Sequence, residues 1–437
     1  MSHVFHRVLT RELPRAVKAE GVWIEDADGQ RYLDGAGGAI VVNVGHGERS
    51  LIEAMTVQSG ATDYIHGTMF TTDALEAYAD DVATVLPLED ARIYPVSGGS
   101  EAVETAMKLA RSYHLARGED TRSLVIGRYA SYHGNTLGAL DVGGKEALKR
   151  PYAPWLGRFG QVSAAYEYRC ANPGHPDSCG AWLADELEAA IAEAGPENVA
   201  AFIAEPVAGA TLAAAVPTDD YWGSVAEVCR RNGVLLIVDE VMTGFGRTGR
   251  WFGVDHWGVR PDILTTGKGS TSGYLPFGFA ACSREVFETV RGKGFVHGFT
   301  WSHNGVGAAV AHAVLHRLRE GDLVDASARQ GERLLKDLTS ELVDSPVVGD
   351  VRGIGLMVGI ELVADRPTKA PSPRREQVTE RVVAGAREQG LLLYSSTGHV
   401  DGDDGDLVML GPPFTISDEE CDLVVERTVA AISATLG

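Results

Sequence analysis

The feature that most constrains the fold is a series of short apolar runs in the middle of the chain. They are rich in valine, isoleucine, leucine and alanine: 123–128 (SLVIGR), 199–207 (VAAFIAEPV), 233–241 (GVLLIVDEV), 262–269 (DILTTGKG) and 277–283 (FGFAACS). Uninterrupted apolar runs of this length are typical of parallel strands that are covered on both faces. Helical patterns lie between several of them, at 178–195 and 218–233 for example. This βαβ rhythm predicts a three-layer α/β domain with a mainly parallel sheet.

The two ends of the chain follow a different pattern. Residues 19–34 have the alternation of a β-hairpin, with its turn near Asp28 and Gly29. From about residue 316 the helical patterns become longer and more charged, and a proline-rich break at 365–376 precedes another helical pattern. We therefore expect a large α/β domain over 60–315, and a smaller α+β domain formed by 1–59 and 316–437.

Composition narrows the class of protein. A chain of 437 residues, 44% of them hydrophobic, can bury one large core or two smaller ones. Its net charge of −21 argues against nucleic acid and anionic membranes as partners. No apolar run is long enough to span a membrane, and the first residues lack the apolar segment of an export signal. The 5 cysteines do not make a disulfide framework, so the cytoplasm is the expected location.

One group of soft ligands stands out. Cys170, His175 and Cys179 lie within ten residues of one another, and such side chains can hold zinc. The spacing is not C-x-x-C, and the sequence offers no fourth ligand to close a tetrahedral structural site. We interpret this segment as a surface loop with two free thiols, and we expect no metal site.

Polar residues follow three of the predicted strands. They are Glu205, Asp239 and Lys268, and ligands of open α/β sheets bind beyond the carboxyl ends of the strands. Lys268 is flanked by glycines, but a nucleotide phosphate loop would need glycine in place of Asp262 and serine or threonine in place of Gly269. The remaining explanation for such a lysine is an imine with a carbonyl cofactor.

Two more segments belong to the same chemistry. Gly99 and Ser100 lead directly into a helical pattern at 95–111, and the free amides of a helix start can bind an anion, although an ordinary cap would look the same. Tyr132 and His133 follow the first predicted strand of the series. Pyridoxal 5′-phosphate accounts for all these features, because it needs an anion cradle, an aromatic face, a carboxylate at its pyridine nitrogen and a lysine for its aldehyde.

Six motifs then connect the chain to a known family. SGGSEAVETAMKLAR, YHG, AEPVAG, VDEVMTGFGRTG, TTGKG and GFTWSHN occur in this order. Over nearly its whole length the chain resembles the class III (ω-type) aminotransferases, which have the fold-type I architecture of pyridoxal-phosphate enzymes. The resemblance implies that an amino group moves from an amine or ω-amino acid to a keto acid by a ping-pong mechanism.

The resemblance also implies roles for individual residues. Lys268 would be the Schiff-base lysine that also moves the substrate proton, and Asp239 would pair with the pyridine nitrogen. Val241 and Tyr132 would cover the two ring faces, with His133 nearby.

Further implied roles concern the phosphate group and the assembly. Gly99 and Ser100 would hold the phosphate, and Thr300 would reach the phosphate of a neighbouring subunit, which implies a homodimer or a dimer of dimers. Glu205 would lie beside the ring and help to position Asp239 or the cofactor oxygen.

Departures from the family pattern concern substrate recognition. Ala210 stands where many relatives that use 2-oxoglutarate have glutamate, Met242 replaces a residue that is often polar, and no arginine occurs in 395–413. These changes predict pyruvate rather than 2-oxoglutarate as acceptor, and amines or diamines rather than glutamate as donors. Four aspartates in the same region form either a solvated turn without a role or an acidic rim that attracts cationic amines: Asp401, Asp403, Asp404 and Asp406.

Other functions remain open on this scaffold. An aminomutase or racemase would keep Lys268 and Asp239 but need no second substrate, and a decarboxylating transaminase would release carbon dioxide. A non-catalytic binding protein would be expected to have lost Lys268 or Asp239, and both are present.

Overall fold

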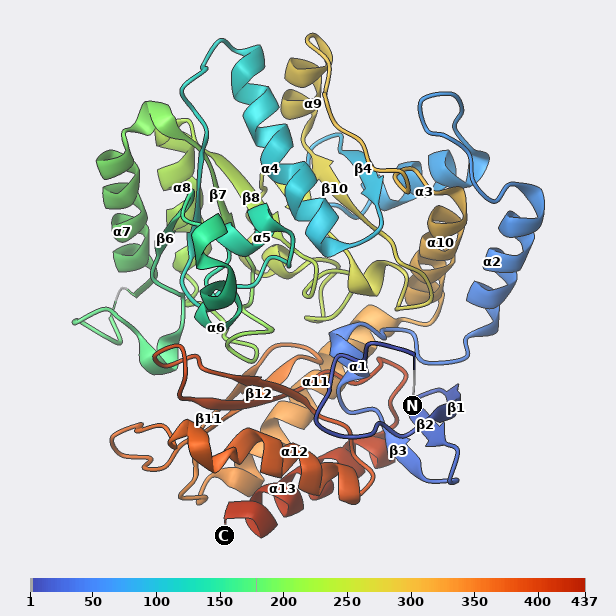
Figure 1. Ribbon diagram of the computed structural model, residues 1–437, viewed down its shortest axis with the longest axis vertical. Helices are drawn as coiled ribbons and strands as arrows, with labels where there is room; N and C mark the ends of the chain where they lie inside the picture. Colours follow the sequence, from blue (N-terminus) through green and yellow to red (C-terminus); the bar gives the residue numbers. More distant parts are fainter. Residues whose placement is uncertain (1–2, 178, 437) are drawn as a thin grey trace.

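The larger part of the molecule is built on a seven-stranded sheet. The computed structural model describes residues 3–177 and 179–436, and Figure 1 shows this sheet and its helices in the upper half of the view. The strand order is β4-β10-β9-β8-β7-β5-β6. Their bounds are Arg92–Val96 (β4), Leu124–Arg128 (β5), Gly160–Val162 (β6), Val199–Ala204 (β7), Leu235–Asp239 (β8), Ile263–Thr265 (β9) and Gly278–Cys282 (β10).

Helices cover both faces of this sheet. One face carries α4 (Gly99–Ala116), α5 (Leu137–Val142) and α9 (Arg284–Arg291), which pack on Ala201, Ile203 and their neighbours. The other face carries α7 (Cys179–Ala194) and α8 (Tyr221–Asn232), which pack on Phe202, Ala204 and their neighbours. Because successive strand residues point to opposite faces, both sets are apolar, and the predicted three-layer architecture is confirmed.

One strand runs against the predicted direction. Strands β6, β5, β7, β8 and β9 are parallel, but β10 is antiparallel to both β9 and β4. A parallel neighbour needs a crossover connection, usually a helix on one face of the sheet. Between Thr265 and Gly278 the chain forms only the short 3-10 turn Lys268–Ser270, so it returns along the same edge in the opposite direction.

The smaller part of the molecule comes from both ends of the chain. Its antiparallel sheet has the order β11-β12-β14-β13, and its helices lie at the bottom of Figure 1. The bounds are Val348–Gly353 (β11), Val358–Leu362 (β12), Tyr394–Thr397 (β13), Asp406–Leu410 (β14), Leu323–Leu342 (α11), Val378–Glu388 (α12) and Asp418–Leu436 (α13). The N-terminal strands β1 (Ala16–Glu20), β2 (Trp23–Asp26) and β3 (Arg31–Leu33) form a separate antiparallel sheet with the predicted turn at 28–29.

The remaining helices are α1 (Gly37–Ile40), α2 (Arg49–Ala61), α3 (Asp73–Ala83), α6 (Glu146–Lys149) and α10 (Gly305–Glu320). Helix α10 packs against both α2 and α3. The predicted domain boundaries, 59/60 and 315/316, fall inside α2 and α10, and the division itself stays a prediction. In the described ranges, no helix is both long and apolar enough to cross a membrane.

A fully buried arginine joins the two parts of the molecule. Arg247 donates to the carbonyls of Leu356 and Pro412 at 2.9 and 2.8 Å, to that of Val42 at 3.2 Å, and to Asn43 Oδ1 at 2.8 Å. Its guanidinium also lies 4.6 Å from the centre of the Phe414 ring. Burial lowers the pKa of Arg247 to about 9, so the group remains charged at neutral pH.

We expect Arg247→Met to lower the free energy of unfolding by at least about 3 kcal/mol, because four buried acceptors lose their donor. Urea unfolding followed by circular dichroism measures this change. Arg230→Met is the matched control, because Arg230 is exposed and pairs with Glu227 at the surface. Equal unfolding midpoints for the two variants would contradict a central role for Arg247.

Candidate active site

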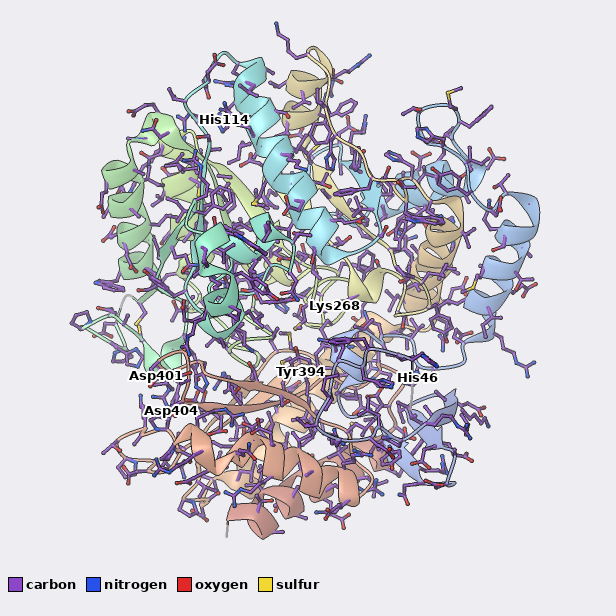
Figure 2. The ribbon with its side chains drawn as sticks, viewed as in Figure 1. His46, His114, Lys268, Tyr394, Asp401 and Asp404 are labelled. Carbon is purple, nitrogen blue, oxygen red and sulfur yellow. The ribbon has the colours of Figure 1, made fainter. Side chains whose placement is uncertain are left out.

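The predicted site residues converge at the carboxyl ends of the parallel strands. A single pocket is lined by Gly99, Ser100, Tyr132, His133, Gly134, Glu205, Ala210, Asp239, Val241, Met242 and Lys268. Figure 2 places Lys268 near the centre of the molecule, where the larger and smaller parts meet. Except for Thr300, the structure therefore brings together every residue that the sequence predicted for this site.

Asp239 is held rigidly from three directions. It is buried at the end of β8. Its Oδ1 accepts hydrogen bonds from Val241 N at 3.1 Å and Thr265 Oγ1 at 3.0 Å. Its Oδ2 lies 2.7 Å from Nδ1 of His133. These three contacts fix the position of the carboxylate, which lines the pocket.

His133 has an unused ring nitrogen. Its Nδ1 is engaged by Asp239, but its buried Nε2 has no hydrogen-bond partner among the described residues. A buried polar atom without a partner is costly, and it often marks a place where a ligand binds.

Lys268 lies on a tight turn after Gly267. Its φ of 40° is in the left-handed region, which a lysine rarely adopts and which stores strain of the kind found at functional sites. Burial lowers the pKa of Lys268, and the charges of Asp239 and Glu205 oppose this shift. The lowered pKa favours the neutral amine, which is the form that attacks a carbonyl carbon.

The helix start beside Lys268 has the form of an anion site. Helix α4 begins at Gly99 without a side-chain cap. A Cβ atom on Gly99 would lie 2.8 Å from Val241 Cγ1, and one on Gly134 would lie 2.4 Å from Ser100 Oγ. Glycine is therefore required at both positions, and the exposed amides of α4 can approach a phosphate group closely.

Tyr132 and Val241 supply the apolar walls, and both contribute to the pocket lining. Burial raises the pKa of Tyr132, and the positive charge of Arg7 partly opposes this rise. Burial and the nearby Tyr132 raise the pKa of Tyr394, and the positive charge of Arg7 opposes this rise as well. The N-terminal segment thus brings a cation within electrostatic range of both tyrosines.

Glu205 follows β7 and is held by an arginine that the sequence analysis missed. Arg128, at the end of β5, donates to Glu205 O at 2.8 Å and contacts Glu205 Oε2 at 3.4 Å. Burial raises the pKa of Glu205, while the charges of His133 and Arg128 oppose the rise. The sequence signal for Arg128 was its position at the end of the predicted strand 123–128.

A second omission is Thr265, whose hydroxyl orients Asp239. It is the last residue of β9, so its place at a strand end was visible in the sequence. Two threonines occur there in succession, and the pattern alone does not indicate which one faces Asp239.

Ala210 and Met242 also line the pocket. Gly209 lies directly behind them, and a Cβ atom there would be 2.1 Å from Met242 Sδ. The methionine therefore occupies the space that a side chain at position 209 would need.

Thr300 and the acidic turn lie elsewhere. Thr300 is exposed on the loop 292–304 and does not line the pocket. The aspartates of the turn have partners of their own: Asp403 pairs with Arg150 at 2.9 Å, Asp404 accepts from Arg374 N at 2.7 Å, and buried Asp406 accepts from Thr379. Asp401 and Asp404 lie toward one side of Figure 2, away from Lys268. This placement favours the interpretation as a turn without a role in substrate binding.

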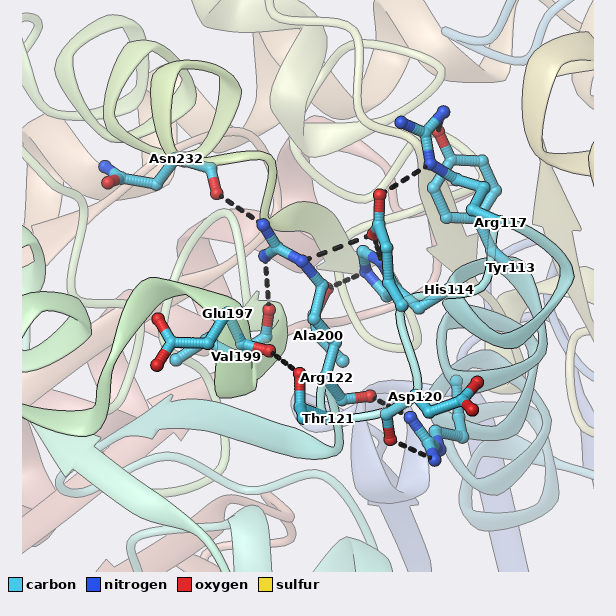
Figure 3. Close-up of polar contacts among 12 residues, drawn as sticks. Tyr113, His114, Arg117, Asp120, Thr121, Arg122, Glu197, Val199, Ala200 and Asn232 are labelled. Atoms are coloured by element: carbon cyan, nitrogen blue, oxygen red, sulfur yellow. Dashed lines mark hydrogen bonds and ion pairs between the residues drawn. The ribbon is translucent and has the colours of Figure 1, made fainter.

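Another polar cluster lies toward the far end of α4. Figures 2 and 3 show His114 there, with Arg122 beside it in Figure 3. His114 contacts the carbonyl of Ala200 at 2.9 Å, and Arg122 donates to the carbonyls of Val199 and Asn232 at 2.8 and 3.1 Å. These contacts with β7 and α8 make the cluster a structural anchor for the helix.

The residues of the pocket fit pyridoxal 5′-phosphate. The α4 amides suit its phosphate, the fixed carboxylate of Asp239 suits its pyridine nitrogen, and the amine of Lys268 suits its aldehyde. The unpaired Nε2 of His133 and the two required glycines show a cavity shaped for a polar ligand.

Comparisons with known proteins agree with this geometry. The family model of class III aminotransferases matches residues 9–432. YodT of Bacillus subtilis, an uncharacterized aminotransferase, is 37% identical over 440 residues, which cover 100% of this chain and 99% of that protein. The putrescine–pyruvate aminotransferase of Pseudomonas aeruginosa is 35% identical, with 95% of this chain and 91% of that protein covered.

A solved structure extends the likeness to three dimensions. An (S)-enantioselective ω-transaminase from Thermomicrobium roseum superposes with a TM-score of 0.93 at 38% identity, covering 100% of this chain and 97% of that chain. Members of this family depend on pyridoxal phosphate, and a related transaminase has been solved with that cofactor bound. The chain belongs to the class III aminotransferases.

Proposed function

We propose that this aminotransferase moves an amino group from an amine or ω-amino acid to pyruvate by a ping-pong mechanism. The observation that carries the proposal is the convergence of Lys268, Asp239 and the start of α4 on one pocket, whose substrate side is formed by Ala210 and Met242.

The chain contributes proton transfer and charge placement. When bound, pyridoxal phosphate supplies an electron sink for the bond to the substrate Cα. Lys268 Nζ would accept the proton that leaves Cα and then donate it to a different carbon, because its lowered pKa suits it to act first as base and then as acid. Asp239, fixed by Thr265 and His133, would hold the pyridine nitrogen of the cofactor.

The preference for pyruvate follows from the residues that line the pocket. None of the eleven lining residues is an arginine, and Lys268 is their only lysine. A second carboxylate, such as that of 2-oxoglutarate, would lose water without gaining an ion pair. The relative named for putrescine and pyruvate also supports a small acceptor and an amine donor.

The proposal includes a homodimer, which larger assemblies can contain as a unit. Thr300 lies on an exposed loop beside Trp301, which is itself exposed and contacts Tyr64 edge to face. Met69 and Phe70, near Tyr64 in sequence, are 71% and 69% exposed. An apolar surface of this kind favours association with a second subunit, whose pocket Thr300 would complete. The proposed compartment is the cytoplasm, consistent with the five free cysteines.

We expect Lys268→Ala to lower turnover of an amine with pyruvate by at least about 10³-fold, because the general base is lost. Lys145→Ala is the matched control, since burial also lowers the pKa of Lys145 but its amine donates to Ser396 outside the pocket. Steady-state assays of product ketone measure both. Similar losses in the two variants would contradict the role of Lys268. Product formed by the wild type from one amino acid without any acceptor would instead support the mutase or racemase.

We expect the cofactor-loaded enzyme to convert L-alanine faster than L-glutamate in single half-reactions, because the pocket offers no arginine for the distal carboxylate. Stopped-flow absorbance of the cofactor at low and high ionic strength measures this difference. Faster conversion of L-glutamate under both conditions would overturn the preference.

The positive charge of Arg7 acts on Tyr132, which lines the pocket. Arg7→Gln should therefore raise the concentration of L-alanine that gives half-maximal conversion. Arg11→Gln should leave it unchanged, because Arg11 lines a separate cavity.

We expect Thr300 to act in the pocket of the partner subunit. At limiting cofactor, mixing Lys268→Ala with Thr300→Val should raise activity from near zero to about one quarter of wild type, because each hybrid has one intact pocket. Mixing wild type with the double variant Lys268→Ala/Thr300→Val should lower activity by about half on subunit exchange, because its hybrids have none. If the first mixture stays inactive and the second is unchanged, Thr300 acts within its own subunit.

A further inference from the structure

The loop that starts at Cys170 brings three metal-binding side chains together, those of Cys170, His175 and Cys179. Cys170 follows the 3-10 turn Glu167–Arg169, and Cys179 begins α7. Cys170 Sγ lies 3.2 Å from Cys179 Sγ, and His175 Nδ1 lies 3.2 Å from the same sulfur. The three ligand atoms all lie within 4.8 Å of one another. The spacing of these residues in the sequence did not indicate that their side chains lie together.

Hydrogen bonds of Asn172 and of the backbone organise the loop. The buried Asn172 side chain donates to Asp177 O at 2.9 Å and accepts from Gly174 N at 2.8 Å. His175 N donates to Asn172 O at 3.1 Å. These bonds fix the path of the chain between the cysteines, so that little ordering is left for a bound ion to impose.

We propose that Cys170, His175 and Cys179 bind one zinc ion, with a solvent molecule as the fourth ligand. Two thiolates and one imidazole suit zinc, which is intermediate in softness and prefers tetrahedral sites. Zinc–sulfur bonds of about 2.3 Å would place the two sulfurs about 3.8 Å apart, so the thiols need to separate by only about half an ångström. The expectation of no metal assumed four protein ligands, and zinc sites with three protein ligands and one solvent molecule also occur.

A second cluster of candidate ligands differs in one decisive respect. Asp81, His312 and His316 also lie close together, but the guanidinium of Arg319 pairs with the carboxylate of Asp81. A metal ion there would compete with a positive charge already in place. No such cation is paired with the thiols of Cys170 and Cys179 in the described contacts.

The position of the zinc site suggests a structural role. Just before Cys170, Arg169 Nε donates to Glu361 Oε1 at 2.6 Å and Arg169 Nη2 donates to Lys369 O at 2.7 Å. Glu361 belongs to β12 and is fully buried. Zinc bound at Cys170 would add a further tie directly beside this contact between the loop and the small sheet. None of the three ligands lines the pocket of Lys268.

The test uses the full-length holoenzyme and zinc itself. Protein purified without chelator should contain about one zinc per chain, and adding zinc to the stripped protein should release about two protons, because both thiols must ionise. Burial and the neighbouring Cys179 raise the pKa of the Cys170 thiol to about 11, so it is protonated before the metal binds. Cobalt in place of zinc should give thiolate charge-transfer absorbance.

Three variants make the result specific. Cys179→Ser should abolish zinc binding, and His175→Ala, at an exposed position, should weaken it at least about tenfold, since even groups that only orient a ligand matter this much. Cys421→Ser is the control, because Cys421 lies in α13 and contacts Gln330. Cofactor content should stay unchanged in all three.

Several outcomes would overturn the proposal. One is stripped protein that takes up no zinc. Another is zinc that is retained by the Cys179→Ser variant. A third is a disulfide between Cys170 and Cys179 in the native protein, which mass spectrometry would detect as a mass two hydrogens below that of the reduced chain. Release of fewer than about one proton per zinc would show that the thiols are not the ligands.

Discussion

The buried charge of Arg247 is the interaction on which the rest of the architecture depends. A buried ion needs hydrogen bonds to offset the loss of water, and the two Nη atoms of Arg247 donate to carbonyls from three distant segments. The fourth partner, Asn43, extends this connection toward the active site. Its amide nitrogen donates to Phe245 O, and its backbone N–H donates to Ser272 Oγ, four residues after Lys268. The junction of the two parts and the turn of the active-site lysine therefore share one network.

The motif VDEVMTGFGRTG combines catalytic and structural residues within twelve positions. Asp239 faces the pocket, whereas Glu240 points away and accepts from Thr243, Gly253 N and Val254 N. Burial raises the pKa of Glu240 to about 7, although these hydrogen bonds oppose the rise. Adjacent acidic residues thus serve opposite purposes, one turned toward a ligand and the other fixing the loop that leads to Arg247.

Much of the fold could be predicted because strand burial leaves a direct mark on sequence. The runs around Ile126, Phe202 and Ile237 are apolar through the middle of each strand, since helices cover both faces. The direction of β10 could not be predicted in this way, because the same burial applies to either direction. It was decided by the connection after Thr265, which contains only the 3-10 turn Lys268–Ser270 and no crossover helix.

The site was predictable to a similar extent and for a related reason. Lys268, Asp239 and Glu205 follow strands, so the topology alone brings them together. Thr265 and Arg128 were missed because their roles depend on which way a side chain points at a strand end. Thr300 and the aspartates of 401–406 depend on surfaces and loop paths, which local patterns do not encode. His175 was underestimated because the turn that carries it toward Cys179 is built by Asn172, through bonds invisible in the spacing of cysteines.

The contact between Gly209 and Met242 has a consequence for how substrate range can evolve. The thioether fills the space beside the glycine, so the two positions cannot vary independently. Enlarging residue 209 would push the flexible methionine toward the pocket and narrow it, without replacing any residue that touches the substrate. Shortening residue 242 first would open most of that space, and position 209 could then accept a side chain once the flexible Met357, whose Cε lies 2.8 Å from the same Cβ position, also moved. The order in which such substitutions arise would therefore decide which amines the descendants accept.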